Sequence, residues 1–251
     1  MNAAAPSAPR WLGALPVLAL LLLWELACRI GGIPPTLLPA PSAVAVRAAT
    51  LLADPDFLAQ LGITLRRLAA GLALAVVAGA ALGIAASLWR ITAQALQTLI
   101  GLLAPLPKIA LYPALLLTLG FADASKIALV FIDAIFPVLI ATFQAVRQMD
   151  SRLLWSAAAM GTSRPRSLTR VVLPACLPAI VTGARVSSVI ACIVVLLSEM
   201  LASSDGLGHV LVAASRSFRT ADMFVPVAII AVTGFALDKA LGVAARKAAH
   251  R

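Results

Sequence analysis

The chain has 251 residues, of which 62% are apolar and only 12% are charged. Soluble domains are about half apolar and about a quarter charged, so this composition and a mean hydropathy of +1.02 exclude an ordinary soluble protein. The apolar residues form long blocks without strand-like alternation, which favours spanning helices over β-barrel strands. The formal charge of +10 lies mostly in loops and at block ends, as is typical of lipid headgroup contacts and not of a nucleic-acid-binding face.

Six membrane-spanning helices are predicted, so the expected fold class is an all-α polytopic membrane protein. Their expected ranges are 12–30, 64–89, 94–119, 125–146, 177–201 and 223–245. The first block superficially resembles a lipoprotein signal that ends at Cys28, but Glu25 stands where such signals carry an apolar residue. We therefore expect an uncleaved first helix. The cysteines form no CxxC pair, so neither a disulfide nor a metal site is predicted.

A short helix is predicted between the first two spans. Ser42 is expected to cap this helix, which covers residues 43–53 and lies on the membrane surface. Residues 1–57 thus form an N-terminal span with an outer amphipathic segment, and residues 58–246 form the main transmembrane domain. The arginines from Arg147 to Arg170 make one loop dense in positive charge, and the positive-inside rule then places this loop and both chain termini in the cytoplasm.

Small residues recur at every fourth position on two predicted spans, and prolines interrupt a third span. In lipid, such stripes let helix backbones approach closely, and packing within one bundle is favoured here over a dimer interface. The prolines predict a kinked span that is either simply packed or borders a translocation path. The stripes are Gly71, Ala75, Gly79 and Gly83, and Gly183, Ser187 and Ala191; the prolines are Pro105, Pro107 and Pro113.

The predicted loop between spans four and five covers residues 150–174. Asp150 can cap a short helix over residues 151–160, and Gly161 can end it because glycine readily adopts a positive φ. A rigid helix followed by a basic tail suits a lever that is gripped by a soluble partner, although an ordinary basic loop fits the composition equally well. The expected apolar face of this helix consists of Leu153, Leu154 and Ala157.

The same segment resembles the signature loop of bacterial ABC-importer permeases, which reads Glu-Ala-Ala, three residues, Gly, nine residues, Ile, any residue, Leu, Pro. Ser156 and Ala157 fall on the two alanines and Gly161 falls on the glycine, followed by Val171 and Leu173-Pro174. In that family this loop forms the coupling helix, which docks into a groove of the ATP-binding subunit. The resemblance implies that the residues of ATPase coupling are Leu153, Leu154, Trp155, Ser156, Ala157, Gly161 and Pro174.

Trp155 departs from the pattern of the family, because it stands at the position of the glutamate. A carboxylate that could pair with a basic group on the ATPase is replaced by a large apolar indole. We therefore expect docking in this protein to depend more on the burial of Trp155 in the groove of the ATPase.

The resemblance extends from about Trp24 to the C-terminus and points to the nitrate, sulfonate and taurine-type permeases. It implies a type I ABC importer transmembrane domain in the bacterial inner membrane, assembled from two permease copies, two ATP-binding subunits and an external solute-binding protein. The sequence has no Gly-Lys dipeptide and hence no P-loop, so ATP and Mg²⁺ are expected on the partner, with no catalytic residue and no cofactor in this chain. The matching segments are 38–42, 64–67, 105–111, 125–127, 136–138, 199–200 and 206–208.

The expected function is alternating-access import of a small anionic or organic solute such as nitrate, a sulfonate or taurine. Ionisable groups within spans are candidates for the pathway, because isolated charge at membrane depth is costly. Lys108 and Arg185 could attract an anion, or Lys108 could pair with Asp133, and Arg185 with a carboxylate, as neutral structural pairs. The candidate pathway residues are Lys108, Asp133, Arg185 and Glu199.

Two other functions fit parts of the sequence. A secondary transporter driven by an ion gradient would contain an inverted repeat and carboxylates around a core site. Asp133 and Glu199 leave this open, but the sequence contains no internal repeat, and the spacing from Gly161 to Pro174 would go unexplained. A membrane enzyme is disfavoured because no nucleophile, base or metal ligands cluster in the sequence.

Overall fold

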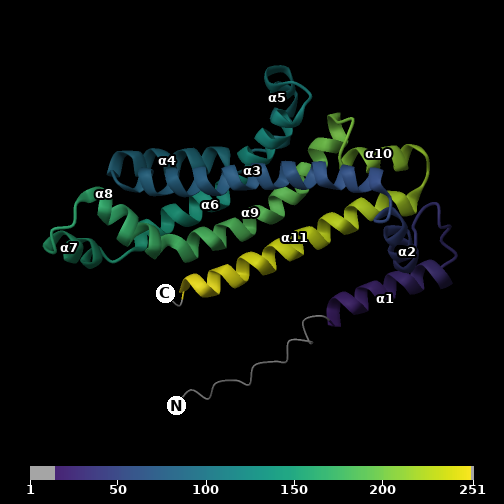
Figure 1. Ribbon diagram of the computed structural model, residues 1–251, viewed down its shortest axis with the longest axis horizontal. Helices are drawn as coiled ribbons and strands as arrows, with labels where there is room; N and C mark the ends of the chain where they lie inside the picture. The colour runs from purple at the N-terminus through teal and green to yellow at the C-terminus, as the bar shows by residue number, and fades with distance from the viewer. Residues whose placement is uncertain (1–14, 250–251) are drawn as a thin grey trace, which may run out of the picture. The chain divides into compact units, whose positions relative to one another are not determined.

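The computed structural model describes residues 15–249, and within this range the regular elements are all helical (Figure 1). Arg10, Arg251 and the start of the first predicted span, residues 12–14, lie outside the described residues. The helices are α1 (Leu15–Ile30), α2 (Pro41–Leu51), α3 (Pro55–Ser87), α4 (Arg90–Leu103), α5 (Tyr112–Leu119), α6 (Asp123–Gln148), α7 (Ser151–Ala159), α8 (Arg164–Ser167), α9 (Leu173–Ala202), α10 (Leu207–Arg216) and α11 (Thr220–Ala249).

Four of the helical segments within residues 15–249 are long and apolar enough to cross a membrane. A fifth span is formed if α4 and the segment Lys108–Leu119 are counted together, with a bend of 87° between them. α1 is described over 16 residues, fewer than the about 20 of a full span. The four segments are α3, α6, Pro165–Ala202, which includes α9, and the part of α11 up to Arg246.

The third predicted span is broken rather than continuous. α4 ends at Leu103, the chain turns through Pro105 and Pro107, and a 3₁₀ turn over Lys108–Leu111 leads into α5. Prolines lack a backbone N–H and clash with the preceding turn, so a helix cannot run straight through this segment. The expected interruption is confirmed, and its consequence is that Lys108 lies at the bend.

Both stripes of small residues pack against α6 of the same chain. A Cβ atom on Gly71 would lie 2.7 Å from the Val130 Cβ, and one on Gly183 would lie 2.8 Å from the Val138 Cα. Ser187 donates a 2.5 Å hydrogen bond to the Ala134 carbonyl on α6. The stripes therefore serve packing within one bundle, as the sequence favours.

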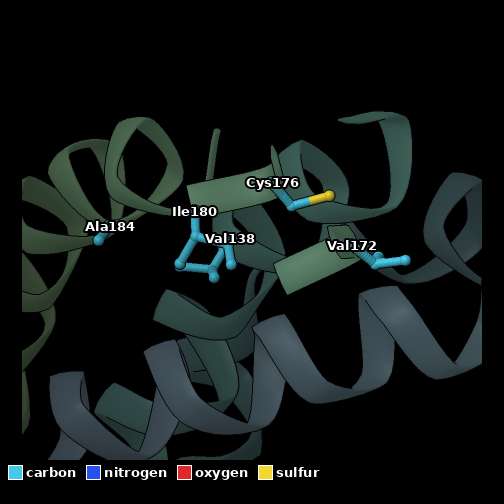
Figure 2. Close-up of a cluster of buried hydrophobic side chains, with 5 residues drawn as sticks. All are labelled: Val138, Val172, Cys176, Ile180 and Ala184. Carbon is cyan, nitrogen blue, oxygen red and sulfur yellow. The ribbon is translucent and has the colours of Figure 1, made fainter. Parts of the chain in front are cut away.

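The core of the bundle extends towards the predicted coupling loop (Figure 2). Val138 on α6 lies in a buried cluster with Val172 and with three residues of α9. Partly buried side chains of α3 and of the segment after α7 pack against this cluster, so the loop and the spans share one hydrophobic core. The residues of α9 in the cluster are Cys176, Ile180 and Ala184, and the partly buried ones include Val76, Ala80, Ile84 and Leu168.

The chain forms two compact units. Within the described residues, one consists of residues 15–58 together with Val210–Ala228, and the other consists of Ala59–His209 together with residues 229–249. In the first unit, the predicted cap of α2 is wrong: α2 begins at Pro41, and Ser42 donates its hydroxyl to Glu25 at 2.7 Å. Proline is pre-organised for the first helical position, so the helix starts before Ser42 and leaves that side chain free to bind α1.

Candidate functional site

α7 is a short helix closed at both ends, as the sequence predicts. The Asp150 carboxylate accepts a 2.9 Å hydrogen bond from the backbone N–H of Arg152, which satisfies one free donor at the helix start. At the other end Gly161 adopts a φ of 74°, and the backbone N–H groups of Gly161 and Thr162 each donate a 3.0 Å bond back to α7, to the carbonyls of Ala158 and Ala157. This pair of bonds is a Schellman motif, which only a residue tolerant of positive φ closes without strain.

The apolar residues of α7 and its C-terminal end differ in their exposure. Ala157 is buried, and Leu154 lines a pocket of about 630 Å³ together with Trp89 and Val172. Leu153 and Met160 are exposed, and Trp155 is 71% exposed. Of the expected apolar face of Leu153, Leu154 and Ala157, only Ala157 is buried, and Leu153 is exposed, as are Trp155 and Ser156.

The basic segment after Gly161 is helical and not the predicted tail. α8 leads into a π turn over Leu168–Val172, in which the backbone N–H of Leu173 bonds to the Leu168 carbonyl. Pro174 stands in the first turn of α9, where its missing N–H removes one α-helical bond and favours the wider turn. Helical structure thus joins the loop to a span, and Figure 1 shows α7 and α8 together at one end of the α3–α6–α9 bundle.

The structure brings Lys108 and Asp133 together in one pocket of about 490 Å³. The Lys108 ammonium lies 3.5 Å from the Asp133 carboxylate and donates a 2.8 Å hydrogen bond to the Ala104 carbonyl. It also lies 4.5 Å from the centroid of the Phe136 ring, within the range of a cation–π interaction. The pocket, called the charged pocket below, is further lined by Pro137, Ile140, Gln144 and Thr182, among others.

Arg185 lies outside the charged pocket and forms an ion pair with Asp238 on α11. Its guanidinium donates two hydrogen bonds to this carboxylate, at 2.8 and 3.1 Å. Both side chains are partly exposed and line a neighbouring pocket of about 350 Å³. A carboxylate partner was one of the two alternatives for Arg185, the other being an anionic solute. The sequence does not identify the partner, because only folding brings residues 185 and 238 together.

Glu199 lies in a buried ionic cluster and not in the charged pocket. Its carboxylate, 0% exposed, accepts hydrogen bonds from Arg67 at 2.9 Å and from Thr64 at 2.8 Å. Arg67, 1% exposed, also binds Asp123 and Asp205, at 2.7 and 2.6 Å. These five residues are called the Arg67 cluster below. They join α3, the start of α6, the end of α9 and the loop that follows it.

Arg67 is a residue of the site that the sequence did not single out. It lies within α3 and is buried in the protein interior. The signal was present in three matching segments of the importer resemblance, residues 64–67, 199–200 and 206–208, which the structure brings into contact. Spacing along the sequence alone does not show that such segments meet.

Comparison with known proteins identifies the family. The model of the binding-protein-dependent transport system inner membrane component matches residues 71–247. The aliphatic sulfonates transport permease SsuC of Bacillus subtilis is 30% identical over 94% of this chain and 86% of its own length. The taurine transport system permease TauC of Escherichia coli is 28% identical over 92% of this chain and 85% of its own.

A solved structure of the MetNI methionine ABC transporter, in an inward-facing conformation, shares the fold. It matches with a TM-score of 0.65 and 15% identity, and covers 74% of this chain and 93% of that chain. The expected importer fold is thus confirmed, and the main functional interpretation is supported over a secondary transporter. Such a subunit works with an ATP-binding partner and a solute-binding protein. This chain belongs to the family of binding-protein-dependent transport system inner membrane components, as the permease subunit of an ABC importer.

Proposed function

We propose that α7 is the coupling helix of this permease and that it docks into a groove of the ATP-binding partner. The single observation that carries the proposal is the exposure of two apolar residues, Leu153 and Trp155, on a short helix that is capped at both ends. Exposed aromatic side chains on rigid elements are typical anchors of protein interfaces. The partner hydrolyses ATP with Mg²⁺, and α7 transmits its closure to the spans.

The buried side of α7 supports this mechanical role. Ala157 packs inward, and the helical segment from α8 through the π turn connects the loop to α9. Val172 of that segment lies in the same buried cluster as Val138 of α6 (Figure 2). Because close-packed cores transmit displacement rather than absorb it, a push on α7 moves both α6 and α9.

The permease assembles as a homodimer with two ATP-binding subunits, and both of its termini lie in the cytoplasm. Support for the second copy comes from the Arg185–Asp238 pair, which is partly exposed within two spans. Charged groups at membrane depth face protein or a water-filled cavity rather than lipid. A second copy of the permease packed against the Arg185–Asp238 pair would shield these charges from lipid. The arginines from Arg147 to Arg170 beside α7 support the orientation through the positive-inside rule.

The solute is a small anionic or organic molecule that passes by the charged pocket. Lys108 and Asp133 are its candidate contacts, with Arg185 beside them and Glu199 holding the wall of the pathway in place. The permeases SsuC and TauC, named for sulfonates and taurine, support this class of solute.

Trp155→Ala tests the coupling role. We expect affinity for the ATP-binding partner and solute uptake to fall by at least about tenfold, because truncating a central interface aromatic costs about 2 kcal/mol or more. The measurements are the dissociation constant between the two purified subunits and uptake into proteoliposomes. Phe121→Ala is the matched control, since Phe121 is also 71% exposed but lies between α5 and α6. Unchanged docking and uptake in Trp155→Ala would overturn the proposal.

A further inference from the structure

We infer that the charged pocket binds a small zwitterion, with the ammonium group of the solute at Asp133 and its anionic group at Lys108. The inference rests on the proposed function and narrows it, because it names the class of solute that contacts the pathway. It starts from two opposite charges on one pocket wall that are side by side but not fully paired.

Asp133 is a carboxylate with unused acceptors. It lies within α6, is 24% exposed and lines the charged pocket. Among residues 15–249, no group donates a hydrogen bond to it, and the Lys108 ammonium at 3.5 Å is beyond hydrogen-bond distance. An ionised carboxylate offers two oxygens with about four lone pairs, and leaving them unsatisfied within a span is costly. Asp133 is therefore open to a cationic group of a ligand.

Lys108 has the complementary property. Its ammonium carries three donors, of which one is taken by the Ala104 carbonyl at 2.8 Å. The Phe136 ring, whose centroid lies 4.5 Å from the ammonium, stabilises the positive charge by a cation–π interaction but provides no oxygen that accepts a hydrogen bond. Donors thus remain for an anionic group that enters the charged pocket.

The arrangement favours a zwitterion over a simple ion. A simple anion that approaches Lys108 is repelled by Asp133, and a simple cation at Asp133 is repelled by Lys108. A zwitterion aligned antiparallel to the pair satisfies both charges and adds no net charge to the membrane interior. Phe136, Pro137 and Ile140 offer apolar surface for the short stem between the two groups of the solute. The volume of about 490 Å³ lies within the range of small-molecule sites.

The test uses the purified complex of this permease with its ATP-binding partner, without the solute-binding protein, whose own selectivity would otherwise dominate. Calorimetric titration compares taurine, a zwitterion, with ethanesulfonate, which lacks the amine, and ethylamine, which lacks the sulfonate. We expect taurine to bind at least about tenfold more tightly than either. Lys108→Met and Asp133→Asn should each weaken taurine binding by at least about tenfold.

Lys239→Met is the matched control, because Lys239 also holds its ammonium over a phenylalanine ring, that of Phe235, but lies outside the charged pocket. It should bind taurine like the wild type. The exchange of both charges, Lys108→Asp with Asp133→Lys, keeps the pair neutral and should retain taurine binding with the solute reversed. This double variant separates a binding role from a loss of folding in the single variants.

Three outcomes would overturn the inference: no taurine binding, equal affinity for taurine and ethanesulfonate, or taurine binding that survives both single substitutions. Each leaves the docking of α7 untouched, since docking is measured separately with Trp155→Ala. Conversely, loss of the coupling role would leave the preference of the charged pocket in place.

Discussion

At the scale of single residues, the Arg67 cluster is a set of buried charges that is stable only when its members are paired. Arg67 meets Glu199, Asp123 and Asp205, and Glu199 also accepts the backbone N–H of Gly208 at 3.0 Å. Buried charges are tolerated only when each is paired and hydrogen-bonded, so the members of the cluster depend on one another. Because Asp205 and Gly208 belong to the segment after α9, these bonds hold that segment against the bundle.

Removing Arg67 should therefore destabilise the fold more than removing an exposed arginine does. Arg67→Met leaves Glu199 buried without its ionic partner, and we expect the free energy of unfolding to fall by about 3–5 kcal/mol. Arg66→Met is the control, because Arg66 is exposed, binds only Asp123 among the described residues, and should cost less than about 1 kcal/mol. Denaturant titration in mixed micelles measures both. Equal effects of the two substitutions would contradict the role of the cluster.

Asp205 makes the stability that the Arg67 cluster contributes depend on pH. Burial alone would raise the pKa of Asp205, but hydrogen bonds from Arg67 and Ser203 outweigh it and hold the pKa below the ordinary value. A lowered folded-state pKa means that the carboxylate stabilises the fold above about pH 4, the value of unfolded Asp, and that this contribution is lost as the pH falls through the folded-state pKa.

We therefore expect the melting temperature of Asp205→Asn to lie below that of the wild type by a constant amount between about pH 5 and 7. The difference should shrink on acidification below about pH 4. Thermal scans of both proteins across this range provide the measurement. A difference that grows with acid would show the opposite sign of the pKa shift.

At the scale of elements, the closed end of α7 depends on Gly161. A Cβ on this residue would meet no atom of the described chain within 4 Å, so substitution acts through the backbone φ of 74° and not through a clash. Gly161→Val should strain the end of the helix by about 1–2 kcal/mol and abolish most uptake, while the protein still inserts. Gly161→Asn, which tolerates a positive φ, should keep most uptake. Proteoliposome uptake separates the two, and equal uptake would refute a role for this helix end.

The contact between α6 and α9 depends on a glycine for a different reason. A Cβ on Gly183 would lie 2.8 Å from the Val138 Cα and 2.9 Å from the Pro137 carbonyl oxygen, and neither backbone atom can move freely. Gly183→Ala should lower the free energy of unfolding by about 1–3 kcal/mol. Gly62→Ala is the control on α3, where the described chain leaves open space and alanine should stabilise by about 0.5–1 kcal/mol. If both substitutions stabilise, the close approach is not required.

Local chemistry predicted some elements well and others poorly. The cap at Asp150 and the break at Gly161 were predictable, because both act within a few residues. The start of α2 was not, since Pro41 competes with Ser42 for the first turn and Glu25 of α1 binds the Ser42 side chain. The helical course of residues 164–172 was also missed, because its basic residues resemble a loop until Leu168 and Val172 pack into the core.

At the scale of the whole molecule, the proposed homodimer gives a direct prediction. Native mass spectrometry of the complex should find this chain and the ATP-binding subunit in a ratio of one to one, with two copies of each. The partly exposed Arg185–Asp238 pair is the reason, because a lone copy would present these charges to lipid. A complex with one copy of the permease would contradict the assembly.

The sequence by itself determined the membrane class, the proline-broken span, the limits of α7 and the family, because each depends on composition, on local backbone preference or on a spaced motif. Lys108 and Asp133 were recognisable as candidates for the same reason, since charge within an apolar block is conspicuous. Only the tertiary structure decided which charges meet: Lys108 with Asp133, Arg185 with Asp238, and Arg67 with Glu199. The physical reason is that ion pairs depend on distance in space, and the partners here lie on different helices that only the packing of the bundle brings together.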